Sequence, residues 1–139
     1  MKKRVRAIIL ENDSVLLIHR IKTNDNYWVF PGGGMEDYDL NEKEALKREC
    51  LEELGVDVSV EKFFDSQIFE LFGTMQEHIF YLCKITGGKV GTGQGPEYAN
   101  DGRYAGEHIP EWMSLDDLKA RDVRPVFVKN RLLDGTSTS

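Results

Sequence analysis

The feature that most constrains the fold of this chain is a group of glutamates within residues 48–55: Glu49, Glu52 and Glu53. The three positions are spaced i, i+3 and i+4, so on a helix their side chains share one face. Like charges at this spacing repel each other by roughly a few tenths of a kcal/mol per exposed pair. Leu46, Cys50 and Leu54 recur at every fourth position of the same segment. The spacing therefore predicts a helix that buries an apolar stripe and presents its carboxylates beside it.

The ends of this helix carry residues that are typical of helix caps. Asn41 is predicted to cap the N-terminus, because its side chain can accept a hydrogen bond from a backbone N–H of the first turn. Gly55 is predicted to end the helix in a left-handed conformation, which gives a helix from about residue 40 to Leu54. Arg48 lies four residues before Glu52, at the spacing of an ion pair that would fix the orientation of this glutamate.

A cluster of carboxylates on one helix face has two interpretations. Most charge runs are solvated helix faces with no further role. The alternative is a site for a divalent cation that prefers oxygen ligands, such as Mg²⁺ or Mn²⁺. The Pro-Gly-Gly-Gly turn at residues 31–34 favours the cation, because glycines without side chains let the backbone approach a ligand closely. Together, such a turn and helix suit a diphosphate that is bridged by cations.

Length and composition limit the classes of protein to which the chain can belong. With 139 residues, one domain is expected over residues 1–134, followed by a disordered tail over residues 135–139. A net charge of −6 argues against non-specific binding to nucleic acid, which requires a basic surface. No segment approaches the roughly twenty apolar residues of a membrane span, and neither cysteine belongs to a C-x-x-C pair. These features predict a cytoplasmic protein with no nucleic-acid or membrane partner.

Strand-like and helix-like segments interleave along the rest of the chain. Strand-like residues at 4–10 and 15–19 flank a turn signal at residues 12–13, which predicts a hairpin. Further strands and helices are predicted at these ranges: strands at 27–30, 56–69, 77–85 and 108–113, and helices at 115–120 and 125–133. Residues 86–106 contain seven glycines and are predicted to form a long loop, of a kind that often serves as a lid or binding loop. The order of elements predicts an α/β fold with a mixed sheet covered by helices on both faces.

At residues 33–56 the sequence resembles the signature of the Nudix hydrolases, the family that includes MutT-like proteins. That signature is G-x5-E-x7-R-E-U-x-E-E-x-G-U, in which U is a bulky apolar residue. The second half is matched at every position from Arg48 to Val56, with Cys50 in an apolar position. Residues 27–31 resemble the usual lead-in and residues 110–118 resemble the strand-to-helix ending of small Nudix domains. The resemblance therefore covers nearly the whole chain.

The first half of the signature is irregular in this sequence. If Gly34 begins the signature, Leu40 takes the place of the first glutamate, which follows that glycine by six residues. If Gly33 begins it, Asp39 takes that place, and the loop to Arg48 is one residue longer than usual. We favour the second register, because it keeps the usual pair of glycines. The replaced glutamate looks structural in the family, so the departure mainly affects the shape of the loop.

The resemblance implies an α/β/α sandwich that hydrolyses a diphosphate with Mg²⁺ or Mn²⁺. It implies catalytic roles for four residues of the predicted helix: Arg48, Glu49, Glu52 and Glu53. In the family the glutamates hold the metal, often together with a carboxylate from a distant loop or strand. Glu107 is our first choice for this additional metal ligand, and Glu97 in the long loop is the second. Each is otherwise interpreted as a solvated surface acid.

The residues predicted to bind substrate are the turn glycines and one aromatic residue: Gly32, Gly33, Gly34 and Trp28. An aromatic ring can stack on a nucleobase, and Tyr27 and Tyr104 are further candidates. The alternative is that Trp28 and Trp112 are core residues, which is the more frequent role of tryptophan. Three basic residues could also contact the substrate, although lone surface cations usually do not: Arg6, Arg20 and Lys22. No ligand-like spacing links the three histidines.

The expected reaction is cleavage of a diphosphate bond in a nucleoside diphosphate linked to another group. A nucleoside triphosphate, an oxidised nucleoside triphosphate and a nucleotide sugar all fit this description. The alternative is a Nudix-like binding or regulatory module without catalysis, but such modules usually lose their metal-site glutamates. Family markers of ADP-ribose and dinucleoside polyphosphate hydrolases are absent from residues 71–74. The partner is thus a small nucleotide-type molecule, and the sequence does not decide between a monomer and a homodimer.

Overall fold

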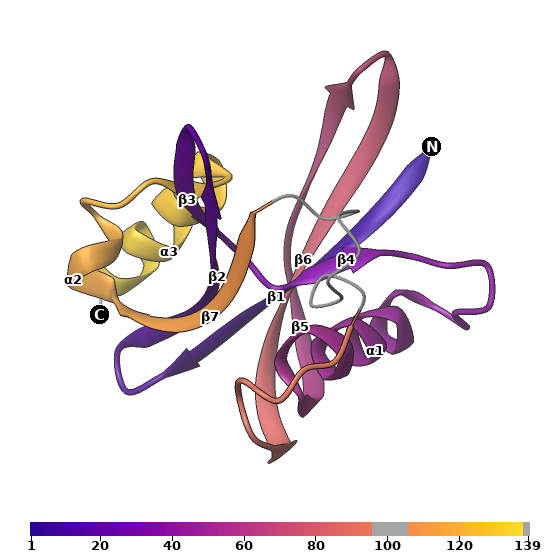
Figure 1. Cartoon of the computed structure of the whole chain (residues 1–139), viewed down its shortest axis with the longest axis horizontal. Coiled ribbons are helices and arrows are strands. Elements are labelled where there is room, and N and C mark those ends of the chain that lie inside the picture. Colours follow the sequence, from indigo (N-terminus) through magenta and orange to yellow (C-terminus); the bar gives the residue numbers. More distant parts are fainter. Residues whose placement is uncertain (96–105, 138–139) are drawn as a thin grey trace.

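The computed structural model describes residues 1–95 and 106–137, and these residues form a mixed sheet with helices on both faces (Figure 1). The strands are Lys2–Glu11 (β1), Ser14–Lys22 (β2), Asp25–Val29 (β3), Gly32–Gly34 (β4), Val56–Leu71 (β5), Thr74–Gly88 (β6), Glu107–Ser114 (β7) and Val123–Arg124 (β8). The helices are Glu42–Leu54 (α1), Leu115–Leu118 (α2) and Val126–Ser137 (α3). The predicted α/β/α architecture is confirmed.

Strand β1 lies at the centre of the sheet. It pairs in antiparallel fashion with β2 and β4 and in parallel with β6. The strand order is β5-β6-β1-β2-β3-β8, with β4 paired to β1 and β7 paired to β2. The predicted hairpin of β1 and β2 is confirmed, and its turn residues Asn12 and Asp13 have φ angles of 50° and 61°. Asparagine and aspartate tolerate this left-handed conformation better than most residues.

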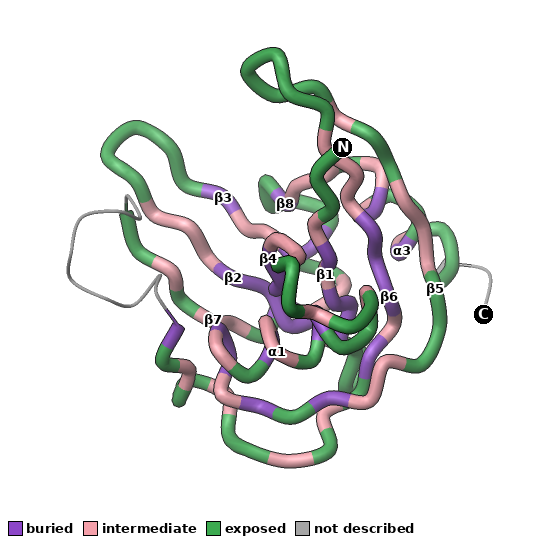
Figure 2. Tube along the Cα trace, turned by 90° about the vertical axis from the view of Figure 1, so that its right-hand side faces the viewer, coloured by how far each residue is buried: buried purple, intermediate pink, exposed green. Residues whose placement is uncertain are grey.

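Two apolar cores form on opposite faces of the sheet. Val5 of β1 belongs to the core that contains Leu46 and Leu54 of α1. Ile8 belongs to the other core, which contains Val128 of α3. This division follows from the strand geometry, because successive side chains of β1 point to opposite faces. Figure 2 shows that the buried positions concentrate in β1, β6 and the inner part of β2.

Several local features differ from the sequence-based expectations. The glycine turn is a short strand, β4, and β8 was not predicted. Helix α3 continues to Ser137, so it includes residues 135–137 of the predicted tail, while residues 138–139 lie outside the described part of the chain. Residues 96–105 of the predicted loop also lie outside it. Trp112, interpreted as a core residue, is 41% exposed, whereas Met113, the next residue of β7, is buried in the core that contains Val128, so the two side chains lie on opposite faces of the strand.

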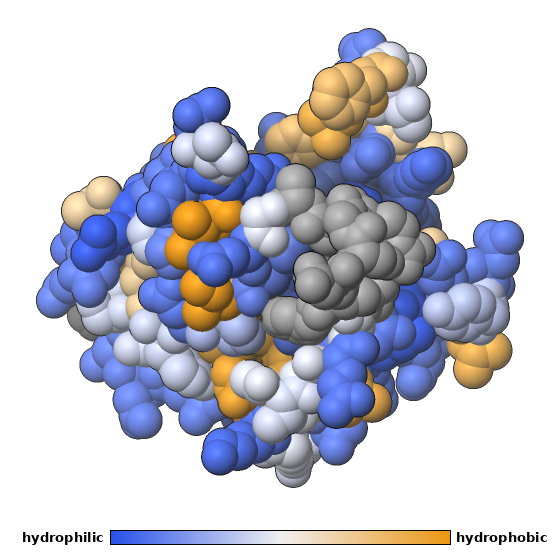
Figure 3. Space-filling model, viewed as in Figure 1, coloured by the Kyte–Doolittle hydropathy of each residue, from blue (hydrophilic) through white to orange (hydrophobic). Residues whose placement is uncertain are grey.

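The visible surface of the molecule is largely hydrophilic (Figure 3). An apolar group stands at the tip of the β5–β6 hairpin, where Leu71, Phe72 and Met75 are exposed. Within the described ranges, no helix combines the length and apolar character that crossing a membrane would need.

Candidate active site

Helix α1 has the caps and the buried stripe that its sequence predicts. The side chain of Asn41 accepts a hydrogen bond from Glu44 N at 2.9 Å, and Gly55 follows the helix with a φ of 80°. Leu46 and Leu54 are fully buried against the sheet. With this side of α1 fixed, the adjacent side presents its glutamates to β4.

Two of the three glutamates, Glu49 and Glu53, contact the glycine strand β4, and the three are buried to different depths. Glu53 is only 7% exposed, and its Oε1 accepts a hydrogen bond from Gly32 N at 2.9 Å. Glu49 lies against Gly33, where a methyl group on the glycine would be 2.5 Å from Glu49 Oε2. The side chain of Glu52 is 35% exposed and is the most open of the three. The lack of side chains in β4 is therefore what lets the carboxylates come so close.

Arg48 connects α1 to the loop before it. Its Nε and Nη2 each donate a hydrogen bond of 2.9 Å to the carboxylate of Asp39, and Nη2 also donates to Gly34 O at 3.2 Å. Its Nη1 lies 3.1 Å from Glu49 Oε1 and 3.2 Å from Glu52 Oε2. The hydrogen bonds to Asp39 are the main reason why the pKa of Arg48 is raised and the pKa of Asp39 is lowered. One guanidinium group thus positions two of the three glutamates.

The contacts of Asp39 bear on the irregular first half of the signature. Asp39 also accepts a hydrogen bond from Glu36 N at 2.8 Å, which closes the loop around its carboxylate. Leu40, the alternative in the other register, is 88% exposed. The geometry supports the register that begins at Gly33, because the longer loop brings the shorter aspartate side chain to Arg48.

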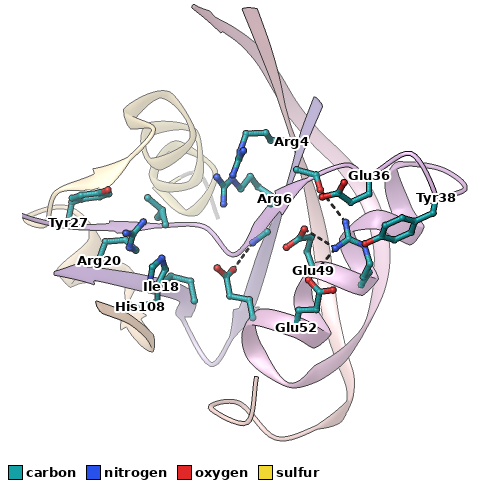
Figure 4. A pocket seen from close by; sticks show the side chains of 16 residues that line it. Arg4, Arg6, Ile18, Arg20, Tyr27, Glu36, Tyr38, Glu49, Glu52 and His108 are labelled. Atoms are coloured by element: carbon teal, nitrogen blue, oxygen red, sulfur yellow. Dashed lines mark hydrogen bonds and ion pairs between the residues drawn. The ribbon is translucent and has the colours of Figure 1, made fainter. Parts of the chain in front are cut away.

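The glutamates line a pocket of about 550 Å³ that carries charges of both signs (Figure 4). Its acidic residues are Glu36, Glu49, Glu52 and Glu53. Its arginines are Arg4, Arg6, Arg20 and Arg48. Figure 4 shows Glu49 and Glu52 at one end, Arg20 and His108 at the other, and Arg4 and Arg6 between the two ends. A pocket with this distribution of charge can accommodate phosphate groups together with cations.

The end of the pocket away from the glutamates also carries apolar side chains. Ile18 and Tyr27 lie there beside Arg20 and His108 (Figure 4), and Val29 is the Cα partner of Ile18. Burial, followed by the charges of Arg20 and Lys22, lowers the pKa of His108 to about 4. The imidazole is therefore neutral at pH 7.

Trp28, predicted to contact substrate, is not among the residues that line this pocket. Its ring stacks on His19 with the centroids 4.1 Å apart, and the side chain is partly buried in the core beneath α3. Its neighbours Tyr27 and Val29 line the pocket instead. Successive residues of β3 point to opposite faces, so Trp28 lies on the far side of the strand.

Glu107, the first choice for a distant metal ligand, is also outside the pocket lining. Its side chain is exposed, whereas the next residue of β7, His108, lines the pocket. Alternation along β7 therefore turns Glu107 away from the glutamates of α1. Glu97 and Tyr104 lie outside the described residues.

Six lining residues were not assigned to the site from the sequence: Arg4, Ile18, Val29, Glu36, Tyr38 and His108. One signal was present, because Arg4 and Arg6 are two residues apart in a predicted strand and so share a face. The face that borders the site depends on the pairing of β1 with β4, which the sequence does not specify.

The donor groups of α1 fit a hard divalent cation in their chemistry. All three offer carboxylate oxygens, which Mg²⁺ and Mn²⁺ prefer. Within residues 1–95 and 106–137, however, no three His, Cys, Asp or Glu side chains converge closely enough to hold a metal ion. Arg48 and Gly32 N–H occupy oxygens of the glutamates instead. Binding of a cation would require these carboxylates to exchange such contacts for the metal.

Comparisons with known proteins agree with the fold. The NUDIX domain model matches residues 1–130 of the chain. A search of curated proteins gives no match. Among solved structures, the E. coli ORF135 protein has 25% sequence identity and a TM-score of 0.71, covering 99% of this chain and 89% of that chain.

Two further solved structures are similar. A NUDIX hydrolase from Nitrosomonas europaea has 21% identity and a TM-score of 0.74, over 99% of this chain and 89% of that chain. An ADP-ribose pyrophosphatase from Streptococcus suis has 25% identity and a TM-score of 0.57, over 88% of this chain and 79% of that chain. With a family match over most of its length and the glutamates in one pocket, the chain belongs to the Nudix family of hydrolases, which act on diphosphate bonds.

Proposed function

We propose that this Nudix hydrolase is a Mg²⁺- or Mn²⁺-dependent pyrophosphohydrolase. Its substrate would be a nucleoside diphosphate linked to another group. The observation that carries the proposal is the position of Glu49, Glu52 and Glu53 in one pocket beside the glycine strand β4. A similar solved structure is described as an ADP-ribose pyrophosphatase, which supports a nucleotide-type substrate.

Hydrolysis of a diphosphate requires that charge on the phosphoryl oxygens be neutralised and that a water be activated. Glu49, Glu52 and Glu53 would hold a cation that polarises a phosphoryl oxygen and lowers the pKa of a bound water. Arg48 orients Glu49 and Glu52 through Nη1, and Gly32 N–H orients Glu53. A carboxylate of this group would accept the proton of the attacking water.

The partner that we propose is a small nucleotide rather than nucleic acid or a membrane surface. The net charge of −6 disfavours a polyanion, whereas the arginines of the pocket give local attraction for a small anion. We further propose a cytoplasmic location, because Cys50 and Cys83 are free and buried, as is usual where thiols stay reduced.

A panel of nucleotides tests the proposed function. We would measure product release from ordinary and oxidised nucleoside triphosphates, ADP-ribose, NADH and diadenosine polyphosphates, with Mg²⁺, with Mn²⁺ and with EDTA. We expect metal-dependent cleavage of one class of substrate and none in EDTA. Folded protein that hydrolyses no member of the panel with either metal would contradict the proposal.

A further inference from the structure

Two arginines of the pocket have no role in the chemistry assigned to the glutamates. Arg4 and Arg6 lie on one face of β1, and their Cα partners in β4 are Gly34 and Gly32. Both side chains line the pocket, between its acidic end and the end that contains Arg20 (Figure 4). The arginine pair and the glutamates therefore border the same short strand.

The two arginines lie on the other side of β4 from Glu49. A methyl group on Gly33 would meet the carboxylate of Glu49, whereas one on Gly34 would lie 3.8 Å from Arg4 Nη1. Consecutive residues of a strand point to opposite faces, so the edge of β4 separates a negative group from a positive one. A substrate with a phosphate chain could cross this edge and contact both groups.

The surroundings of the arginine pair favour an anion. Arg6 Nη1 donates a hydrogen bond to Phe30 O at 3.2 Å, and burial, followed by the charge of Arg4, lowers the pKa of Arg6 to about 10. Arg4 Nε is buried, and none of the described residues accepts a hydrogen bond from it. A buried donor without an acceptor costs free energy, and so do two neighbouring positive charges.

Among the described residues, the charged groups that face the pair leave Arg4 Nε without a hydrogen-bond acceptor. His78 of β6 lies opposite Arg4, and burial together with the two arginines lowers its pKa to about 4, so it is neutral at pH 7. Glu49 and Glu53 act on Arg6 through their charge, but their carboxylates are held by Arg48 and Gly32 N–H. Within the part of the chain that the structure describes, Arg4 thus borders the pocket with a buried donor that an anionic ligand could satisfy.

We propose that Arg4 and Arg6 bind a phosphate group of the substrate beyond the diphosphate held at the glutamates. The substrate would then be a nucleoside triphosphate rather than a nucleotide sugar. A sugar would present only neutral hydroxyl groups to the two guanidinium groups, whereas a phosphate forms charge-assisted hydrogen bonds with them. This inference rests on the proposed pyrophosphohydrolase function and specifies its substrate class.

A binding experiment without catalysis tests the arginine pair directly. Dissociation constants for inorganic tripolyphosphate, ATP and ADP-ribose would be measured by calorimetry in EDTA at low ionic strength, with wild type, Arg4→Gln and Arg6→Gln. Lys2→Gln is the matched control, because it removes an exposed positive charge from the same strand. We expect each arginine variant to weaken tripolyphosphate and ATP binding about tenfold or more, and ADP-ribose and the control to change less than about twofold.

Arg4→Gln is the more informative variant, because Arg4 Nε makes no hydrogen bond within the described residues and its loss should leave the fold intact. Equal loss of ATP and ADP-ribose binding, or tripolyphosphate binding that is absent or independent of both arginines, would overturn the inference. The two proposals fail differently. A wild type that hydrolyses no member of the nucleotide panel with Mg²⁺ or Mn²⁺ contradicts the pyrophosphohydrolase, while the binding comparison still decides the role of the arginines.

Discussion

Single residues determine how closely helix α1 approaches the glycine strand β4, and Gly33 is the clearest case. A methyl group at this position would lie 2.5 Å from Glu49 Oε2, so the carboxylate would have to move. We expect Gly33→Ala to reduce kcat on the order of ten- to a hundredfold, because small displacements of catalytic groups are costly. Steady-state kinetics on the substrate found in the panel would measure this.

Gly87→Ala is a suitable control for this substitution. Gly87 lies in β6 outside the pocket, and its nearest neighbour would be the end of the flexible Asp57 side chain at 3.3 Å. We expect near-normal kcat for the control and similar melting temperatures for both variants. If Gly33→Ala turned over substrate as fast as Gly87→Ala, the close approach of Glu49 to β4 would not matter for catalysis.

His78 gives the fold a defined dependence on pH. Burial, followed by the charges of Arg6 and Arg4, lowers its pKa from 6.5 to about 4. Between these values the unfolded chain binds a proton that the folded chain does not, so unfolding becomes easier as the pH falls. We expect the free energy of unfolding in urea to be highest above about pH 6.5 and to decrease towards pH 4.

The contribution of His78 can be separated from that of His108, whose pKa is also lowered to about 4. His78→Gln removes one of the two groups, so we expect a weaker decrease in stability between pH 7 and pH 4.5 than in wild type. If His78→Gln lost as much stability between pH 7 and pH 4.5 as wild type does, His78 would not be held neutral in the folded protein.

For single residues, the sequence predicts side-chain contacts within one helix but not those that depend on strand pairing. The Asn41 cap and the pair of Arg48 with Glu52 follow from spacing within one helix and are confirmed. The orientation of Trp28 and Glu107 depends on which face of β3 and β7 borders the pocket, and both residues lie away from it. Strand alternation gives the period of the pattern but does not say which face is inside.

At the scale of elements, the stability of α1 should come from one side of the helix. Leu54 is fully buried, whereas Leu51 of the same helix is 52% exposed. We expect Leu54→Ala to lower the free energy of unfolding by about 2–5 kcal/mol, because it removes buried methyl groups and leaves a cavity. Denaturant unfolding, with Leu51→Ala as the matched control, would measure the difference.

The control should lose less than about 1 kcal/mol, as is usual for an exposed position. Similar losses in the two variants would mean that α1 is not anchored through its apolar stripe, and that the position of the glutamates has another cause.

The longer elements could be predicted because their patterns extend over many residues. The hairpin of β1 and β2, the strands β5 and β6 and helix α1 all follow from apolar periodicity and turn signals. The short strands β4 and β8 could not be predicted in this way. Glycines have low β propensity, and two or three residues become a strand only when a partner is adjacent. The end of α3 could not be predicted either. The sequence beyond residue 134 has no periodic apolar pattern, yet the helix continues to Ser137.

At the scale of the whole molecule, the sheet separates and positions the two charged groups of the site. Helix α1 covers one face and α3 the other, and β4 carries the glutamates on one side and the arginine pair on the other. The fold class follows from the order of strands and helices, and the family match confirms it. The strand order, with β1 between β2 and β6, could not be predicted, because it depends on pairing between segments far apart in the chain.

The proposed function requires that the glutamate face of α1 hold a divalent cation. The most direct test is the affinity for Mn²⁺, measured by calorimetry on wild type, Glu53→Gln and the control Glu44→Gln. Glu53 is buried beside β4, whereas Glu44 is exposed in the first turn of the same helix. An amide is a poor ligand for a hard cation, so we expect Glu53→Gln to weaken Mn²⁺ binding by about tenfold or more and Glu44→Gln to leave it unchanged. Equal Mn²⁺ affinity in all three proteins would show that the glutamate face of α1 is not the cation site.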